Sequence, residues 1–294
     1  RVDSVGICGS DMHAYLGHDE RRPAPLILGH EVAGTVVETG QRVTVNPLVT
    51  CGTCRYCLDG RDNLCTRRQI ISMPPREGGF AQFLTMPERN LVPVPDDVPS
   101  DMAALAEPIA CGWHGARMAE TVVGKPEKAL VIGGGAIGVG AALSLVASGC
   151  AQVMIVEPNA DRRRFLGAQA GLASCAPDQV GDDALYDLVV DAVGIEASRA
   201  QASHAVRPGG VIIHIGLGSA QGGLDVRRMT LQEITFIGTY TYTMKDFRNT
   251  AEAMFDGRMG ALDWAEQRPL SEGARAFADL KAGLVSAPKI ILKP

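Results

Sequence analysis

Hydrophobic and polar residues follow two different patterns along the chain. Up to about residue 108, short runs rich in Val, Thr and Leu are separated by prolines and glycines, which is typical of an irregular β domain. Beyond residue 128, short apolar segments alternate with helix-like stretches. The apolar segments span residues 129–133, 152–157, 188–192, 211–216 and 235–240. This alternation predicts a parallel sheet covered by helices on both faces.

The two patterns predict an α/β protein of two domains, and 294 residues are enough to build two cores. We expect residues 110–248 to form the parallel-sheet domain. Residues 1–109 and 249–294 would form the irregular β domain. The second of these segments has helix-like residues and a short final strand.

The sequence of the first domain lacks an expected segment at two places. The opening residues form a strand-like run with no earlier strand to pair with, and the run that ends at Thr39 continues into the next one almost without a connection. We therefore hold the hypothesis that chain before Arg1 and after Gly40 has been removed. A full-length sequence without extra residues at these points would contradict it.

Composition excludes some classes of function. The net charge of −5 argues against a protein that binds nucleic acid by neutralising phosphates. Residues 129–156 carry no charge and could suggest a membrane helix, but their glycines divide them into a strand, a turn, a helix and a second strand. No signal segment opens the sequence, so the eight cysteines suggest a reducing compartment, and we expect a cytoplasmic protein without membrane partners.

Four cysteines lie close together with the spacing C-x2-C-x2-C-x7-C, at Cys51, Cys54, Cys57 and Cys65. One loop with this spacing can surround a tetrahedral zinc ion with four thiolates, which leaves no position for a substrate. The site would therefore be structural. Four free buried cysteines and an iron–sulfur cluster are the alternatives, and the density of the cluster and the lack of a second one favour zinc.

The glycine pattern G-x-G-x-x-G occurs at Gly133, Gly135 and Gly138, between an apolar strand and a helix. A second strand follows and ends at Glu157, at the distance where an acidic side chain meets a ribose hydroxyl pair. Gly133 would allow the turn, Gly135 the approach of a pyrophosphate and Gly138 the close packing of the helix. We predict that this turn, with the helix start at Ala136 and Ile137, binds a dinucleotide.

Glu157 favours NAD over NADP, because it would repel a 2′-phosphate and accept hydrogen bonds from a free ribose hydroxyl. Arg162 follows nearby and begins a run of three arginines. This run leaves NADP as an open alternative.

A second metal site is indicated near the start of the chain. Cys8 offers a thiolate and His30 an imidazole, which suit zinc in a catalytic site with three protein ligands and one open position. These two residues require a third ligand from elsewhere in the chain.

These motifs together resemble the zinc-dependent medium-chain dehydrogenases of the alcohol dehydrogenase family, in the branch of sorbitol, threonine and idonate dehydrogenases. The resemblance covers essentially the whole chain. It is carried by the four-cysteine loop and by residues 6–11, 29–31, 78–81, 107–108 and 133–138. It implies a GroES-like catalytic domain and a Rossmann domain, with the active site in the cleft between them.

The resemblance also implies roles for individual residues. Glu107 would be the third ligand of the catalytic zinc, with Glu31 just behind the metal and Asp11 orienting the His30 imidazole. Ser10 and His13 would carry the substrate proton to solvent. An acidic residue at a helix start is the plainer interpretation of Glu107, and an exposed loop histidine that of His13.

The implied activity is hydride transfer between NAD and a secondary alcohol, with a small polyol or sugar-derived substrate and a homo-oligomeric, dimeric or tetrameric, assembly. One departure puts sorbitol itself in doubt, because Tyr240, Thr241 and Tyr242 stand where sorbitol dehydrogenases carry Phe-Arg-Tyr. The alternatives are a zinc-free quinone or enoyl reductase, an NADP-dependent reductase, and a dinucleotide-binding protein that no longer catalyses. The metal-ligand motifs count against the first.

Overall fold

The computed structural model describes residues 1–181 and 185–294, and the chain divides into two compact units. Unit 1 comprises Arg1–Glu107, Tyr242–Gly257 and Leu262–Pro294; unit 2 comprises Pro108–Thr241 and Arg258–Ala261. The second crossing lies at residue 242, earlier than the expected 249, because Tyr242 and the helix that follows it pack within unit 1.

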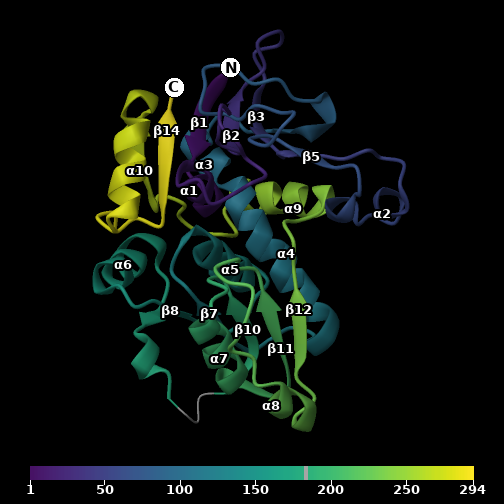
Figure 1. Cartoon of the computed structure of the whole chain (residues 1–294), viewed down its shortest axis with the longest axis vertical. Coiled ribbons are helices and arrows are strands. Elements are labelled where there is room, and N and C mark those ends of the chain that lie inside the picture. The colour runs from purple at the N-terminus through teal and green to yellow at the C-terminus, as the bar shows by residue number, and fades with distance from the viewer. Residues whose placement is uncertain (182–184) are drawn as a thin grey trace. The chain divides into compact units, whose positions relative to one another are not determined.

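Unit 1 is built on an irregular sheet with the strand order β13-β14-β1-β2-β3-β6 (Figure 1). Its strands are β1 (Val2–Gly6), β2 (Glu31–Thr35), β3 (Arg42–Val45), β6 (Leu91–Pro93), β13 (Ala265–Pro269) and β14 (Lys289–Lys293). A small separate sheet pairs β4 (Leu48–Val49) with β5 (Gln69–Ile70). The prediction that this part of the chain is an irregular β domain is confirmed.

The first strand has partners on both sides. β1 pairs antiparallel with β14 from the C-terminal tail and with β2, so that Gly6 lies between Ile291 and Glu31. The turn from β2 to β3 is closed by a hydrogen bond from the Val36 N–H to the Gln41 carbonyl. The strand that carries the chain toward Cys8 is therefore held in the interior of the sheet.

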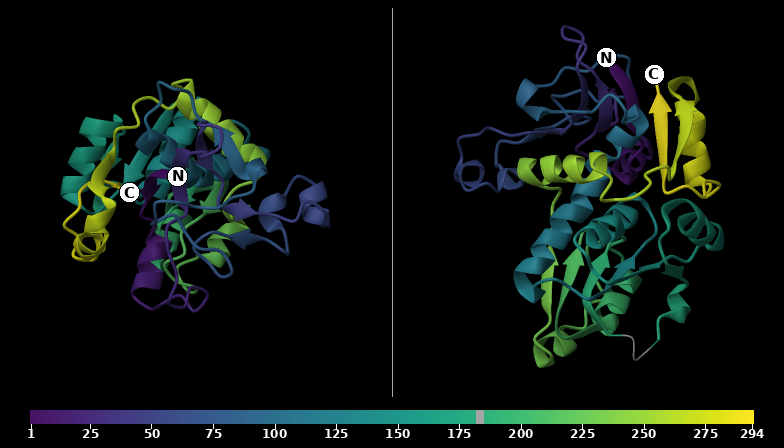
Figure 2. Two further views of the ribbon diagram at one scale, coloured as in Figure 1. Left: turned by 90° about the horizontal axis from the view of Figure 1, so that it is seen from above. Right: turned by 180° about the vertical axis from the view of Figure 1, so that it is seen from behind.

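Helices of unit 1 complete this frame. They are α1 (Gly9–Tyr15), α2 (Arg55–Leu58), α3 (Ser100–Ala104), α9 (Met244–Phe255) and α10 (Gly273–Lys281), with short 3-10 turns η1 (Asp62–Leu64), η2 (Glu88–Asn90) and η5 (Leu270–Glu272). α3 packs on β1, β2 and β3 through Ala103 and Ala104, both fully buried. α10 packs against β13, and the yellow C-terminal helix and strands lie together in Figure 2.

Unit 2 contains a parallel sheet with the order β12-β11-β10-β7-β8-β9 among its described strands. The strands are β7 (Lys128–Ile132), β8 (Gln152–Val156), β9 (Ser174–Cys175), β10 (Tyr186–Asp191), β11 (Val206–His214) and β12 (Thr235–Gly238). The order reverses between β7 and β10, which is the doubly wound arrangement whose ligands bind at the carboxyl ends of the strands. The fold class predicted for this part of the chain is confirmed.

The helices and short turns of unit 2 are α4 (Ala106–Val123), which begins at the end of unit 1, α5 (Ala136–Ala147), α6 (Ala160–Phe165), η3 (Leu166–Ala170), η4 (Pro177–Gln179), α7 (Glu196–Ala205) and α8 (Val226–Leu231). Because the chain moves in opposite directions from β7 to β8 and from β10 to β11, right-handed crossovers place α5 and α7 on opposite faces. On the α7 face, Ala202 and Ala205 pack with Leu130, Val189 and Ile212 in a buried core.

Candidate active site

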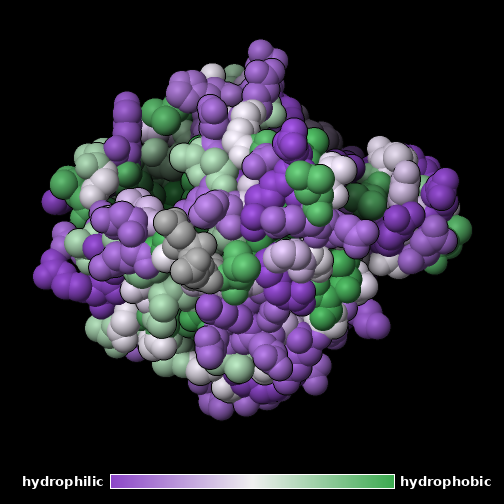
Figure 3. Space-filling model, turned by 90° about the horizontal axis from the view of Figure 1, so that it is seen from below, coloured by the Kyte–Doolittle hydropathy of each residue, from purple (hydrophilic) through white to green (hydrophobic). Residues whose placement is uncertain are grey.

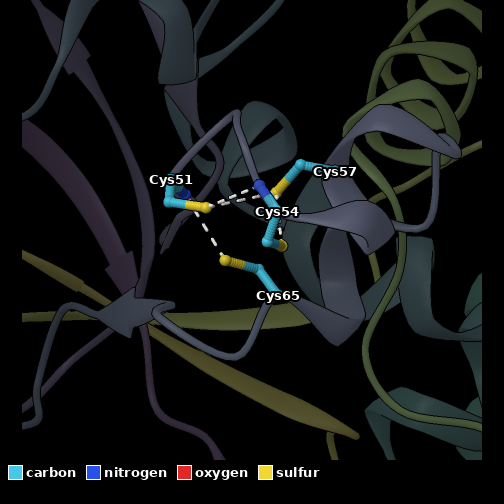
Figure 4. Close-up of side chains that lie close together, drawn as sticks. All are labelled: Cys51, Cys54, Cys57 and Cys65. Carbon is cyan, nitrogen blue, oxygen red and sulfur yellow. Dashed lines mark hydrogen bonds between the residues drawn. The ribbon is translucent and has the colours of Figure 1, made fainter.

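The four cysteines of the 51–65 loop point their sulfur atoms toward one another (Figure 4). The Sγ atoms of Cys51 and Cys57 are 3.9 Å apart, and those of Cys54 and Cys57 are 3.6 Å apart. Four thiolates bound to zinc at about 2.3 Å stand about 3.8 Å from one another. These two separations match a tetrahedral zinc site, and all four sulfur atoms lie within 4.8 Å of one another.

Hydrogen bonds favour the thiolate form of Cys51, whereas burial raises the pKa of Cys57 to about 12. The backbone N–H groups of Thr53 and Cys54 and the Arg67 guanidinium all donate to the Cys51 sulfur. The Thr53 N–H contributes most and lowers the pKa of Cys51 to about 5. A thiolate is the form that binds zinc, so the local structure supports the predicted structural site.

A second group of metal-binding side chains lies near the end of β1 and the beginning of β2. One donor atom each from Cys8, His30 and Glu31 lies within 4.8 Å of the others. Tetrahedral donors bound to one zinc ion at 2.0–2.3 Å lie about 3.3–3.8 Å apart, so these three residues could share an ion after moving toward one another by up to about 1 Å. His30 and Glu31 are buried, whereas Cys8 is partly exposed and leaves access to the group.

Asp11 holds this group in place. Its two carboxylate oxygens accept hydrogen bonds from the backbone N–H groups of Cys8, at 2.9 Å, and Gly29, at 3.2 Å. One of them also lies 3.5 Å from Nδ1 of His30. Burial opposes ionisation of Asp11, but the nearby His30 and these hydrogen bonds outweigh it and lower the pKa of the carboxyl. With Nδ1 turned to Asp11, Nε2 of His30 is the nitrogen left to bind a metal.

The two carboxylate oxygens of Glu31 have different surroundings. Its Oε1 accepts a 2.6 Å hydrogen bond from the buried ammonium of Lys289, which also donates to the Ile7 carbonyl. Its Oε2 is buried and has no hydrogen-bond partner among the described residues. A buried carboxylate oxygen is costly to leave unpaired, so Oε2 is suited to binding a cation in this group.

Glu107 stands at the start of α4, outside the group formed by Cys8, His30 and Glu31. It is buried, and its Oε1 accepts a 2.6 Å hydrogen bond from the Tyr242 hydroxyl. Burial raises the pKa of Glu107, although the charge on His30 lowers it. The charges on His30 and Glu31 influence the pKa of Glu107, so Glu107 lies near the group. Because it is not one of the three grouped residues, its assignment as third metal ligand stays a prediction.

The two residues expected to carry the proton both lie on α1. Ser10 is partly buried in the first turn, where its carbonyl accepts a hydrogen bond from the buried Arg22. His13 is exposed. A relay from the metal group to solvent would have to pass along this helix.

The glycine turn has the shape predicted for binding a pyrophosphate. Gly133 has φ of +105°, a left-handed conformation that side chains disfavour. A Cβ on Gly138 would lie only 1.8 Å from the Gly133 carbonyl oxygen, whereas a Cβ on Gly135 would meet nothing within 4 Å. Gly135 therefore leaves open space in front of α5, where the N–H groups of Ala136, Ile137 and Gly138 have no intrahelical partners.

Glu157 lies directly behind this turn. Its two carboxylate oxygens accept hydrogen bonds from the backbone N–H groups of Gly134, at 2.9 Å, and Asn159, at 2.8 Å. Each oxygen retains a lone pair for a further donor. Arg163 donates to the Glu157 and Pro158 carbonyls. Arg162 lies partly buried on α6, and its contact with the cofactor stays a prediction.

Sequence reasoning missed several residues of unit 1 that complete the site. Lys289 reads as an ordinary strand lysine, and only the pairing of β14 with β1 brings it to Glu31. Ser72 follows an isoleucine in an unremarkable run, yet its hydroxyl lies 3.3 Å from Nδ1 of His30. Tyr242 lies in the segment 240–242 that the sequence comparison singled out, but nothing in that motif indicated its hydrogen bond to Glu107.

A closed four-thiolate site, an open thiolate–imidazole–carboxylate site and a dinucleotide-type glycine turn in one chain define a metal-dependent dehydrogenase. Residues 1–96 match the family model of the alcohol dehydrogenase GroES-like domain, and residues 136–256 match that of the zinc-binding dehydrogenases. L-galactonate-5-dehydrogenase of Escherichia coli is 32% identical over 279 residues, covering 89% of this chain and 81% of that protein. A probable D-xylulose reductase A of Neosartorya fischeri is 28% identical and covers 96% of this chain and 86% of that protein.

Solved structures of dehydrogenases have the same fold as this chain. An Escherichia coli oxidoreductase of unknown specificity superposes with a TM-score of 0.90 at 26% identity, covering all of this chain and 90% of the other. A zinc-binding dehydrogenase of Sinorhizobium meliloti bound to NADP gives 0.89 at 25% identity, covering all of this chain and 91% of the other. The chain belongs to the zinc-binding alcohol dehydrogenase family, as its motifs predicted, and it is an oxidoreductase.

No helix within the described part of the chain is long and apolar enough to cross a membrane. Figure 3 shows one face of the molecule, where hydrophilic residues surround small hydrophobic patches. Such scattered patches are ordinary for a protein surface in water.

Proposed function

We propose that the protein is a zinc-dependent dehydrogenase that transfers hydride between NAD and a secondary alcohol of a polyol or sugar-derived molecule. The grouping of Cys8, His30 and the unpaired Oε2 of Glu31 carries this proposal. Relatives named for galactonate and xylulose support the substrate class.

The residues have separable tasks. Cys8, His30 and a carboxylate, from Glu31 or Glu107, would hold zinc, whose positive charge supplies acidity to an alcohol oxygen. The nicotinamide ring supplies the hydride acceptor. Asp11 would orient the His30 imidazole. Ser10 would accept the proton of the alcohol at its hydroxyl oxygen, and the exposed His13 would pass a proton to water.

NAD is proposed over NADP because of Glu157. Its carboxylate lies at the end of β8, where it would accept a hydrogen bond from a ribose 2′-hydroxyl and repel a 2′-phosphate. Arg163 is engaged by backbone carbonyls, which lowers its availability for a phosphate. The NADP-bound relative makes NADPH the necessary comparison.

Assembly and location belong to the same proposal. β12 is an edge strand of the described parallel sheet, so it can pair with a second copy and give a dimer or, by further contacts, a tetramer. Eight free cysteines, four of them at zinc spacing, suit a reducing cytoplasm.

A substrate panel tests the proposal. Sugar alcohols, aldonates and simple secondary alcohols are supplied with NAD or NADP, and NADH or NADPH is followed by absorbance. Cys8→Ser should lose one zinc ion per chain and at least about 1000-fold in turnover. Cys175→Ser, a half-buried cysteine of unit 2, is the matched control and should keep both.

Two results would reject the enzyme. Full zinc and full turnover in Cys8→Ser would refute the ligand assignment. Tight dinucleotide binding with one zinc per chain and no turnover on the whole panel would support a binding protein that does not catalyse.

A further inference from the structure

Arg199 of α7 is a buried cation whose hydrogen bonds all serve one end of the parallel sheet. Its side chain is 5% exposed. Nε donates to the Gly222 carbonyl at 2.6 Å, and one terminal nitrogen donates to the carbonyls of Gly194, at 2.9 Å, and Ser219, at 3.0 Å. The other terminal nitrogen donates to the Ser219 hydroxyl, at 2.8 Å, and to the Gln221 carbonyl. All five N–H donors of the guanidinium are thus used.

These acceptors lie on two loops that follow neighbouring strands. Gly194 belongs to the loop after β10, and residues 215–223 form the loop after β11. The two loops also contact each other directly, since the Ser219 N–H donates to the Gly194 carbonyl at 2.7 Å. A Cβ on Gly194 would lie 2.1 Å from the Gly216 carbonyl oxygen, so the backbones approach closely. Arg199 fastens both loops to one helix.

The fastened loops adjoin the glycine turn. The Ala192 N–H donates to the Ile132 carbonyl at 3.0 Å, and a Cβ on Gly133 would lie 2.6 Å from the Val193 side chain. In a doubly wound sheet of this order, one half binds each mononucleotide of a dinucleotide across the point of reversal. Glu157 assigns the adenosine half to β7 and β8. The loops held by Arg199 therefore border the nicotinamide half.

We propose that Arg199 is a positioning residue for the nicotinamide half of the dinucleotide. It touches neither cofactor nor substrate in this role, and it sets the backbone against which the nicotinamide nucleotide lies. Its five donors bind carbonyls and a hydroxyl that would otherwise be hydrogen-bonded to water, and they thereby restrict the movement of the loop after β11. This inference rests on the proposed dinucleotide-dependent function.

The chain contains a matched control for this residue. Arg228 of α8 also donates to backbone carbonyls, those of Ser203 and Val206, at 2.7 and 2.8 Å. These carbonyls lie at the end of α7 and the beginning of β11, so Arg228 braces the amino-terminal end of the strands, opposite to the end where the dinucleotide would bind. Replacing it removes the same kind of contact from the same unit.

Binding of NADH and AMP separates the role of Arg199 from general stability. Both dissociation constants are measured by calorimetry on the zinc-loaded full chain for the wild type, Arg199→Lys, Ser219→Ala and Arg228→Lys. Arg199→Lys should weaken NADH binding about tenfold or more and leave AMP binding within about twofold. Ser219→Ala, which removes a single acceptor, should weaken NADH binding about threefold with the same selectivity. Arg228→Lys should change neither.

The results that would contradict the positioning role differ from those that would contradict the proposed function. Unchanged NADH binding in both Arg199→Lys and Ser219→Ala, or equal loss of NADH and AMP in Ser219→Ala, would overturn the positioning role. A wild type that binds neither NADH nor NADPH would instead overturn the proposed function. If Arg199→Lys does not fold, the milder Ser219→Ala decides.

Discussion

Two glycines of the same turn should respond to the same substitution in different ways. Gly138→Ala would place a Cβ 1.8 Å from the Gly133 carbonyl oxygen. Ordinary carbon–oxygen contacts are about 3.3 Å, so α5 would have to move by about 1.5 Å relative to the turn. Overpacking of this size costs about 1–3 kcal/mol of stability. We therefore expect Gly138→Ala to lower both the melting temperature and dinucleotide affinity.

Gly135→Ala places its Cβ in open space, where it meets nothing within 4 Å. Its φ of −79° suits alanine, so the free energy of unfolding should stay within about 1 kcal/mol of the wild type. The Cβ would nevertheless occupy the space in front of the helix N–H groups. Loss of charged hydrogen bonds of about 1.5–3 kcal/mol predicts a rise of about 10- to 150-fold in the NADH dissociation constant.

The assay combines thermal unfolding with NADH binding for both variants. Gly167→Ala is the control, because its Cβ also meets nothing and it lies outside the turn. Gly135→Ala that binds NADH as tightly as the wild type would refute the placement of the pyrophosphate at this turn.

Four further substitutions test other parts of the structure. Cys54→Ser should remove one zinc ion per chain and lower the melting temperature, as read by metal analysis and calorimetry; an unchanged zinc content would contradict a four-thiolate site. Asp11→Asn should weaken zinc binding about 10- to 100-fold in chelator competition, since the His30 imidazole loses its partner; an unchanged affinity would argue against this orienting role. Tyr242→Phe should lower kcat/KM about 5- to 100-fold by leaving the buried Glu107 carboxylate without its donor, and equal kinetics would show that this bond is dispensable. Asp187→Asn should cost about 1–2 kcal/mol at pH 7 in denaturant unfolding, because hydrogen bonds from Arg207 and two backbone N–H groups outweigh burial and lower the pKa of Asp187; the difference from the wild type should shrink as pH falls below about 4, and a constant difference would refute this cause.

Local signals were sufficient wherever the chemistry lies in one stretch of chain. The spacing of the four cysteines and of Gly133, Gly135 and Gly138 determines their geometry, because each set lies on one loop or turn. The alternating strands and helices of unit 2 were likewise visible, since buried parallel strands are continuous apolar runs.

Contacts between distant residues could not be derived in the same way. The first strand has no earlier strand to pair with, and the sequence did not indicate that β14 pairs with it and brings Lys289 to Glu31. The position of Glu31 among the metal-binding groups depends on the register of β1 with β2, in which Gly6 leaves room for its carboxylate. Such registers are set by the packing of the whole sheet.

Anomalous scattering at the zinc edge from crystals of the zinc-loaded protein would show directly whether a metal ion binds beside Cys8 and His30. We expect two peaks per chain, one among the four cysteines and one beside Cys8 and His30 with a carboxylate of Glu31 or Glu107 as the third ligand. A protein with full zinc occupancy at the cysteine loop and no peak beside Cys8 and His30 would contradict it.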